Sequence, residues 1–223
     1  MPSSSHLRGP ADLAEASRVA GVRDERVLAA VARLPRALFV PGDLTGDAYV
    51  DQPVAISHGQ VTTQPSLVAK MVEALALSGE EKVLEVGTGF GYQTALLAML
   101  AREVWSIELW PDMTDATRAA LTKVGIQNVT LLVADGTLGL PDGAPFDAIV
   151  VAAAFPTVPP PLAEQLGKGG RLVQPIGPGG REDVRLFQKR GERLDVEGRV
   201  TGAYFVPLYG EHAYPLEQAP AEP

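Results

Sequence analysis

The chemistry-bearing residues of this sequence follow three apolar runs, and their types suit a nucleotide-like ligand. The motif GTGFG, residues 87–91, stands between the run VLEV and a helix-like run from Tyr92. Glycines at such a turn permit positive φ and let a ligand lie against bare backbone. Glu108 comes 21 residues after Gly87, a spacing at which an acidic residue accepts hydrogen bonds from ribose hydroxyls. Asp135 adds a carboxylate suited to an adenine amine.

The charge around this motif selects among nucleotide-like ligands. The spacing G-x-G-x-G is not that of a dinucleotide site, and no Lys-Ser or Lys-Thr follows as in a P-loop. Glu85, Glu108 and Asp135 are acidic, and no Lys or Arg lies within residues 83–101, so a phosphate is disfavoured. A ligand with ribose, adenine and a cationic centre fits better. We therefore predict S-adenosyl-L-methionine as methyl donor, with S-adenosyl-L-homocysteine as its product.

These residues can form one site only if the strands that precede them end at the same edge of a sheet. The runs KVLEVG, EVWSIEL, VTLLVAD and FDAIVVAAA are continuously apolar, as strands buried on both faces of a parallel sheet are. The helix-like stretches YQTALLAMLA and DMTDATRAALTKVG lie between them. This alternation predicts a doubly wound, Rossmann-like α/β fold, in which ligands bind at the carboxyl ends of the strands.

The flanking segments have other patterns. DLAEASRVAGV and DERVLAAVARL predict two helices, with Asp24 as N-cap of the second, and Pro65 opens another. Residues 41–64 predict a long ordered loop, a type that is often functional. After a helix around PPLAEQLG, four strand-like runs (GRLVQPIG, VRLFQKRG, RLDVEGRV and AYFVPLYG) predict antiparallel strands that finish the sheet.

We divide the chain accordingly. Residues 1–78 are assigned to N-terminal helices and an active-site loop, and residues 79–180 to a donor-binding core. Residues 181–214 are assigned to antiparallel C-terminal strands completing the same domain, and residues 215–223 to a flexible tail.

Composition argues against several classes of function. The 223 residues carry a net charge of −8, and the 19 Lys and Arg are scattered, so we expect no nucleic-acid partner. Cysteine is absent and the three histidines lack metal-ligand spacing, so we expect no metal. No run of 18 apolar residues and no apolar leader occur, which predicts no membrane association and a cytoplasmic protein. We expect a monomer.

Seven segments form a recognisable set: RALFVP (36–41), AYVDQPVAI (48–56), GQVTTQPSLVAKM (59–71), LEVGTGFGYQTALLA (84–98), ADGTLGLPDGAPFDAIVVAAA (134–154), LAEQLGKGGRLVQPIG (162–177) and FVPL (205–208). In these segments the chain resembles the protein-L-isoaspartate O-methyltransferases, over roughly residues 24–210. Many methyltransferases share the glycine motif, whereas the combination of AYxDxP, GQxTxQP, the stretch beginning DGTLG and a late FVPL is far more specific.

The resemblance implies methyl transfer to the free carboxylate of L-isoaspartyl residues in proteins or peptides. The ester then closes to a succinimide, which hydrolyses partly to aspartyl and so repairs the backbone. The resemblance also places the loop after Gly59 over the donor and the backbone near Val206 and Leu208 against the peptide. The predicted donor contacts are then Gln60, Val61, Thr62, Glu85, Gly87, Thr88, Gly89, Gly91, Tyr92, Glu108, Leu109, Asp135 and Gly136.

A carboxylate acceptor suits these residues, because its pKa of about 4 leaves it ionised at neutral pH, with no need of a general base. The family's serine in the pattern T-x-S-x-P falls at Thr63, which keeps the hydroxyl and adds a stiffer χ1. We predict Thr63 as the catalytic hydroxyl; the alternative is that it only forms a turn. We expect His58 to be a plain loop residue and Asp51 to order the loop, and Trp110 is a further candidate for the adenine border.

Two other functions stay open on the sequence. Because Thr63 departs from the pattern, a tailoring O-methyltransferase acting on one aspartate of a peptide natural product is an alternative. A protein that binds S-adenosylmethionine without turnover is the other. Methylation of an isoaspartyl peptide against its aspartyl counterpart separates these functions.

Overall fold

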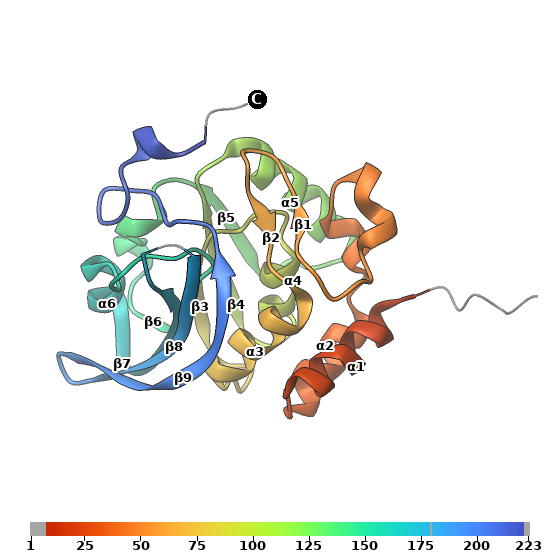
Figure 1. Ribbon diagram of the computed structural model, residues 1–223. Coiled ribbons are helices and arrows are strands. Elements are labelled where there is room, and N and C mark those ends of the chain that lie inside the picture. Colours follow the sequence, from red (N-terminus) through yellow and green to blue (C-terminus); the bar gives the residue numbers. More distant parts are fainter. Residues whose placement is uncertain (1–7, 179, 221–223) are drawn as a thin grey trace, which may run out of the picture.

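A seven-stranded sheet forms the centre of the computed structural model, which describes residues 8–178 and 180–220 (Figure 1). The strand order is β5-β4-β3-β6-β7-β8-β9. The strands are β3 (Lys82–Val86), β4 (Glu103–Glu108), β5 (Val129–Val133), β6 (Phe146–Val151), β7 (Leu166–Ile176), β8 (Gly180–Arg190) and β9 (Arg193–Phe205). The first five strands in this order run parallel, whereas β8 and β9 are antiparallel. The predicted Rossmann-like α/β fold is confirmed.

The order of the strands creates the ligand-binding edge. From the central strand β3 the chain proceeds outward through β4 and β5, and then returns to place β6 on the other side of β3. Connections on the two sides of β3 therefore diverge, which leaves a crevice beyond the carboxyl ends of the strands. The glycine motif at 87–91 follows β3 directly and lies at this crevice.

Two apolar cores separated by the sheet explain the continuous apolar runs. Val83 and Val150 pack into the core on one face, and Leu84 and Ile149 pack into the core on the other. All four side chains are almost fully buried, and each contributes about 1.5–3 kcal/mol of hydrophobic stabilisation. A strand with both faces covered has no polar face to alternate with the apolar one.

Most helices pack on the first of these faces. They are α1 (Pro10–Ala20), α2 (Glu25–Arg33), α3 (Pro65–Leu75), α4 (Tyr92–Ala98) and α5 (Pro111–Val124), whereas α6 (Pro160–Gln165) packs on the other face. The predicted N-cap is confirmed, since the Asp24 carboxylate accepts a hydrogen bond from the backbone N–H of Arg26. Pro65 occupies the first position of α3, where its missing N–H costs nothing.

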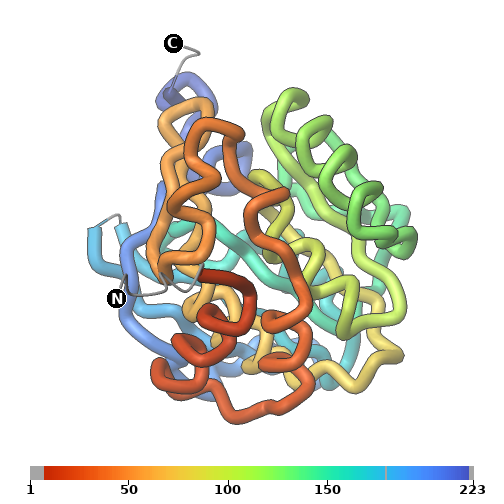
Figure 2. The backbone as a smooth tube through the Cα atoms, turned by 90° about the vertical axis from the view of Figure 1, so that its right-hand side faces the viewer, coloured from red at the N-terminus to blue at the C-terminus, as the bar shows by residue number. Residues whose placement is uncertain are grey.

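The segment between α2 and α3 is more structured than a loop. It contains the 3₁₀ helices η1 (Arg36–Phe39) and η2 (Gly42–Asp47) and a two-stranded hairpin of β1 (Val54–Ala55) and β2 (Val61–Thr62). Figure 2 shows this segment in orange on the side facing the viewer. The hairpin folds because Arg36, a fully buried side chain, donates hydrogen bonds to the backbone of residues 48, 50 and 52 and to the Thr62 hydroxyl.

The C-terminal half of the sheet differs from the prediction in two ways. The run GRLVQPIG forms β7, which is parallel to β6 because α6 makes a crossover between them. The runs RLDVEGRV and AYF form the single strand β9 instead of two. Gly198 and Gly202 lie inside β9, and the register with β8 shifts twice, between Thr201 and Arg199 and between Gly198 and Val196.

The segment after β9 returns to the other elements. Bridges join Ala154 to Pro207 and Tyr209 to Tyr214, and η5 spans Leu216–Gln218 within the predicted tail. Residues 221–223 of that tail lie outside the described residues. Strands of the predicted C-terminal part, 181–214, belong to the same sheet as the predicted core.

Candidate active site

A cavity opens at the carboxyl edge of the parallel strands. The ends of β3, β4 and β6, the β1–β2 hairpin and residues 206–209 form its walls. It gathers most of the predicted site residues, namely Gln60, Val61, Thr62, Thr63, Gly87, Thr88, Gly89, Tyr92, Glu108, Leu109, Gly136, Val206 and Leu208. Three predicted donor contacts, Glu85, Gly91 and Asp135, do not line it.

The glycine turn supplies bare backbone to this cavity. Gly87 has φ 92°, and a Cβ there would lie 3.3 Å from the side chain of Ala152, which follows β6. The absence of a side chain thus lets the turn pass close to the next strand end. Gly91 is required for helix packing, because a Cβ at this position would clash with Thr117 Cγ2 on α5, at 2.5 Å. This glycine lets α4 pack closely against α5 instead of contacting a ligand.

Glu108 is the acid that the fold presents to the cavity. Its side chain is buried, and its carboxylate accepts hydrogen bonds from the backbone N–H groups of Gly89, Leu109 and Trp110, the first two at 2.7 Å. Burial raises the pKa of Glu108, although these N–H groups favour its ionised form. The carboxylate is held rigidly at the cavity wall, where a ribose hydroxyl can donate to its remaining lone pairs.

Glu85 lies behind the cavity wall, contrary to the prediction that it binds the donor. Its carboxylate accepts hydrogen bonds from Thr94 Oγ1 at 2.5 Å, Ser106 Oγ at 2.6 Å and Gln93 Nε2 at 3.0 Å. Burial raises the pKa of Glu85 to about 7 against these hydrogen bonds. Glu85 therefore connects β3 to β4 and to the first turn of α4.

Asp135 is likewise turned away from the cavity. Its Oδ1 accepts hydrogen bonds from the backbone N–H and the hydroxyl of Thr137, and its Oδ2 accepts one from the N–H of Glu211 at 2.7 Å. The carboxylate fastens the segment after β9 to the end of β5. Only Gly136 of this predicted pair lines the cavity.

The hairpin over the cavity is clamped to the start of α5. Ser57 Oγ donates to one carboxylate oxygen of Asp112, and His58 Nε2 lies 2.9 Å from the other. The His58 ring also stacks on Trp110, with centroids 4.8 Å apart and planes 12° apart. His58 thus holds the hairpin from behind, and Trp110 lines the cavity.

The two threonines of the hairpin have different surroundings. The Thr62 hydroxyl is engaged inside the fold, because it accepts hydrogen bonds from Arg36 and from the N–H of Val54. Among the described residues, no side-chain hydrogen bond involves Thr63, which lines the cavity beside it. Thr63 therefore has the hydroxyl that is available to a ligand.

Comparison with known proteins identifies the family. Residues 10–213 match the family profile described as Protein-L-isoaspartate(D-aspartate) O-methyltransferase (PCMT). The chain belongs to this family. A protein-L-isoaspartate O-methyltransferase of Methanoculleus marisnigri is 48% identical over 203 residues, which cover 91% of this chain and 92% of the relative. The resemblance in the sequence motifs is thereby confirmed.

Solved structures with the same description share the fold. A protein-L-isoaspartate O-methyltransferase structure superposes with a TM-score of 0.79 at 26% identity, covering 94% of this chain and 68% of the other. A beta-aspartate methyltransferase (PCMT) of Plasmodium falciparum, solved in complex with S-adenosyl-L-homocysteine, superposes at 0.76 with 22% identity, covering 90% and 98%.

The donor of this family, S-adenosyl-L-methionine, fits the side chains of the cavity. Among the described residues no Lys or Arg lines the cavity, and its acid is Glu108, so the walls suit a cationic ligand without phosphate. Two buried atoms on the walls, Tyr92 Oη and Gln93 Oε1, lack hydrogen-bond partners within the described chain. Buried polar atoms are normally paired, and these two belong to residues of the cavity wall.

A second cavity adjoins the first. It runs between β2, α3 and the end of β9 and shares Val61, Thr62, Thr63, Ala152 and Val206 with the donor cavity. Of the two predicted peptide contacts, only Val206 reaches it. The backbone of Leu208 is engaged inside the fold, because its N–H donates to Ala154 and its C=O accepts from Tyr214.

The sequence reasoning missed part of the cavity wall. The missed residues are Ile56, Val68, Val86, Gln93, Ile107, Met113, Ala152, Ala153, Pro207 and Tyr209. Ala152 and Ala153 could have been predicted, because they directly follow a buried strand of the parallel sheet, where ligands bind. The others are mostly apolar residues, which look in sequence like ordinary core. Within residues 8–178 and 180–220, no group of three His, Asp or Glu is placed to hold a metal, and no helix is long and apolar enough to span a membrane.

Proposed function

We infer that this chain transfers a methyl group from S-adenosyl-L-methionine to the free carboxylate of L-isoaspartyl residues in proteins or peptides. The methyl ester closes to a succinimide, with loss of methanol, when the following backbone nitrogen attacks it. Hydrolysis of the succinimide returns part of the material to normal aspartyl. The observation that supports this function is the junction of the two cavities, whose shared lining includes Thr63.

In the donor cavity, the residues of the chain bind and orient S-adenosyl-L-methionine. S-adenosyl-L-methionine, when bound, supplies a methyl group activated by its sulfonium. Glu108 would accept hydrogen bonds from the ribose hydroxyls of the donor, and Trp110 would pack against its adenine. The acidic wall favours the positive charge of the donor. The turn at 87–89 keeps the backbone close to the ligand.

On the acceptor side, catalysis rests on alignment. The isoaspartyl carboxylate is ionised at neutral pH and is itself the nucleophile, so no general base is required. Thr63 donates a hydrogen bond to this carboxylate and fixes the oxygen that attacks the methyl group. Holding the reacting groups in line lowers the entropic part of the barrier.

The release of S-adenosyl-L-homocysteine tests this function. We expect release with an isoaspartyl peptide and none with the aspartyl peptide of the same sequence. Equal release with both peptides would indicate the tailoring alternative, and tight donor binding without release would indicate a non-catalytic binder. The comparisons do not favour either of these alternatives.

The role of Thr63 has its own test. Thr63→Val removes one hydrogen bond to a charged group, so we expect kcat/KM for the isoaspartyl peptide to fall about ten- to hundredfold. Thr63→Ser keeps the hydroxyl and is the matched control, with activity expected near that of the natural chain. Full methylation by the valine variant would show that Thr63 only shapes the turn.

The sequence also supports proposals on the oligomeric state, the localisation and the partners of the chain. We propose a monomer that acts in the cytoplasm on isoaspartyl proteins, without binding nucleic acid or membranes. The net charge of −8 supports the exclusion of nucleic acid. Light scattering of the purified protein, with and without an isoaspartyl peptide, tests the monomer.

A further inference from the structure

The second cavity, a groove between β2, α3 and the end of β9, is lined by positive charge although the chain as a whole is acidic. The chain has 27 acidic and 19 basic side chains, yet the groove is lined by Lys70 and Arg181 and, among the described residues, by no acid. Asp51 lies nearby but not on the lining, and its carboxylate is engaged with Gln64 Nε2 and the N–H of Ser66. An anionic segment would therefore meet two cations and no lining carboxylate.

Both cations lack the ion pairs that neighbouring arginines make. On β8 and β9, Arg190 and Arg193 pair with Glu197 and Asp195, and Arg199 pairs with Asp183. Within the described part of the chain, no carboxylate lies within ion-pair distance of Lys70 or of Arg181.

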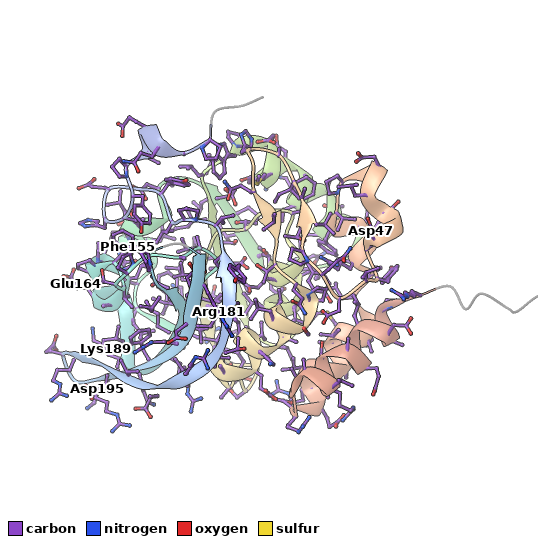
Figure 3. The ribbon with its side chains drawn as sticks, in the orientation of Figure 1. Asp47, Phe155, Glu164, Arg181, Lys189 and Asp195 are labelled. Carbon is purple, nitrogen blue, oxygen red and sulfur yellow. The ribbon has the colours of Figure 1, made fainter. Side chains whose placement is uncertain are left out.

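Each cation is positioned by the fold on a different wall. Lys70 shares one face of α3 with Ser66 and Leu67, which also line the groove. Arg181 stands near the start of β8 (Figure 3), and its Nε lies 3.4 Å from where a Cβ of Gly202 would be. Arg199 Nη2 lies closer still to that point, at 2.5 Å, so the absence of a side chain at Gly202 leaves room for both guanidiniums.

Lys70 lies a few peptide residues away from Thr63 along α3. Lys70 comes five positions after Pro65 in α3, which corresponds to about 8 Å along the helix axis. An extended chain advances about 3.3 Å per residue, so this distance from the start of α3, just after Thr63, equals two or three residues of an extended peptide.

The groove suits a polypeptide better than a small acid. Its wall includes Tyr204, which is 76% exposed, and Val61, which is 42% exposed, and β9 is the edge strand of the sheet. Large exposed apolar side chains beside a groove are typical of peptide-binding surfaces. The cations then lie where the chain flanking the isoaspartyl residue must pass.

We propose that Lys70 and Arg181 select acceptor sequences that carry an acidic side chain two or three residues from the isoaspartyl residue. This inference rests on the proposed function, because it assumes that the reacting carboxylate lies at Thr63. Partly exposed ion pairs are each worth little, so the pair gives a preference of about three- to tenfold in kcat/KM. The preference weakens as salt is added, because exposed charges are screened.

The experiment compares isoaspartyl peptides that differ at one flanking position. Glu or Gln is placed two or three residues before or after the isoaspartyl residue, and kcat/KM is measured at low and high salt. We expect a Glu-over-Gln ratio of about three to ten in at least one register, falling towards one at high salt. In Lys70→Gln/Arg181→Gln the ratio is expected to be near one at both salt concentrations.

A variant with the same change in net charge serves as control. Arg118→Gln/Lys123→Gln alters two exposed cations on α5, away from the groove, and is expected to keep the Glu-over-Gln ratio. The proposal is overturned if the unaltered chain shows no preference in any register, or if the groove variant keeps the preference. Absence of methylation of every isoaspartyl peptide by the unaltered chain would instead contradict the proposed function.

Discussion

Glu85 and Glu108 are both buried strand glutamates, but their carboxylates have different partners. Glu108 is held by three backbone N–H groups at the cavity wall. Glu85 is held by three side chains behind that wall. The first arrangement leaves an acid available to a ligand, and the second uses an acid to join three elements. The type of residue alone does not separate these roles.

The buried position of Glu85 predicts a pH dependence of stability. Its pKa in the folded protein is about 7, above the ordinary value of 4.5. Between these two values the folded protein holds a proton at Glu85 that the unfolded chain releases, so the free energy of unfolding falls as pH rises. We expect a loss of about 2–3 kcal/mol between about pH 5 and about pH 8 relative to Glu85→Gln.

Urea unfolding of the two proteins at both pH values measures this difference. Glu164, an exposed glutamate on α6 that Figure 3 labels, provides the control variant Glu164→Gln. If the unaltered chain and Glu85→Gln show the same change in stability with pH, the carboxylate is already ionised in the folded protein and the prediction is wrong.

At the scale of elements, the β1–β2 hairpin depends on supports at both ends. Arg36 holds residues 48–52 and Thr62 at one end, and the clamp of His58 on Asp112 holds the tip. A two-stranded hairpin is barely stable alone, so these contacts keep it over the donor cavity. The separate motifs RALFVP, AYVDQP and GQVTTQP therefore form one structural unit around a buried guanidinium.

Arg36→Met tests this support. The substitution removes the guanidinium donor from three backbone carbonyls and the Thr62 hydroxyl, so we expect the free energy of unfolding to fall by about 3–5 kcal/mol. Arg33→Met, at an exposed position on α2, is the control and is expected to change stability by less than about 0.5 kcal/mol. Thermal and urea unfolding measure both. Similar stabilities of the two variants would show that the hairpin does not need the guanidinium.

At the scale of the molecule, the active site joins segments that are far apart in the chain. Asp135 at the end of β5 contacts Glu211, 76 residues later, and the segment between β9 and Glu211 supplies Val206, Leu208 and Tyr209 to the cavity. The Thr137 hydroxyl strengthens the same junction by accepting a hydrogen bond from the N–H of His212. Closure of the cavity thus depends on a carboxylate outside it.

Asp135→Ala is expected to loosen this closure. Loss of the acceptor for Glu211 and Thr137 costs about 1–3 kcal/mol and weakens binding of S-adenosyl-L-homocysteine. Hydrogen exchange at the Glu211 amide and calorimetric titration of the ligand measure the two effects. Asp142→Ala, at an exposed position in η4 (Pro141–Gly143), is the control. An unchanged Glu211 amide together with unchanged ligand affinity would mean that the segment is held without Asp135.

The strands β3, β4, β5 and β6, the edge at which their ends meet and the glycine turn beside Glu108 can be predicted from the sequence alone. These features depend on local patterns, because a buried strand followed by glycines is legible within a few residues. The packed chain was needed to show that Glu85, Gly91 and Asp135 support the site instead of lining it. It was also needed to show that β7 is parallel, that β9 is one long strand, and that Lys70 and Arg181 line the same groove. Each of these outcomes depends on partners from distant segments, and a side chain's partner is fixed only when the whole chain has packed.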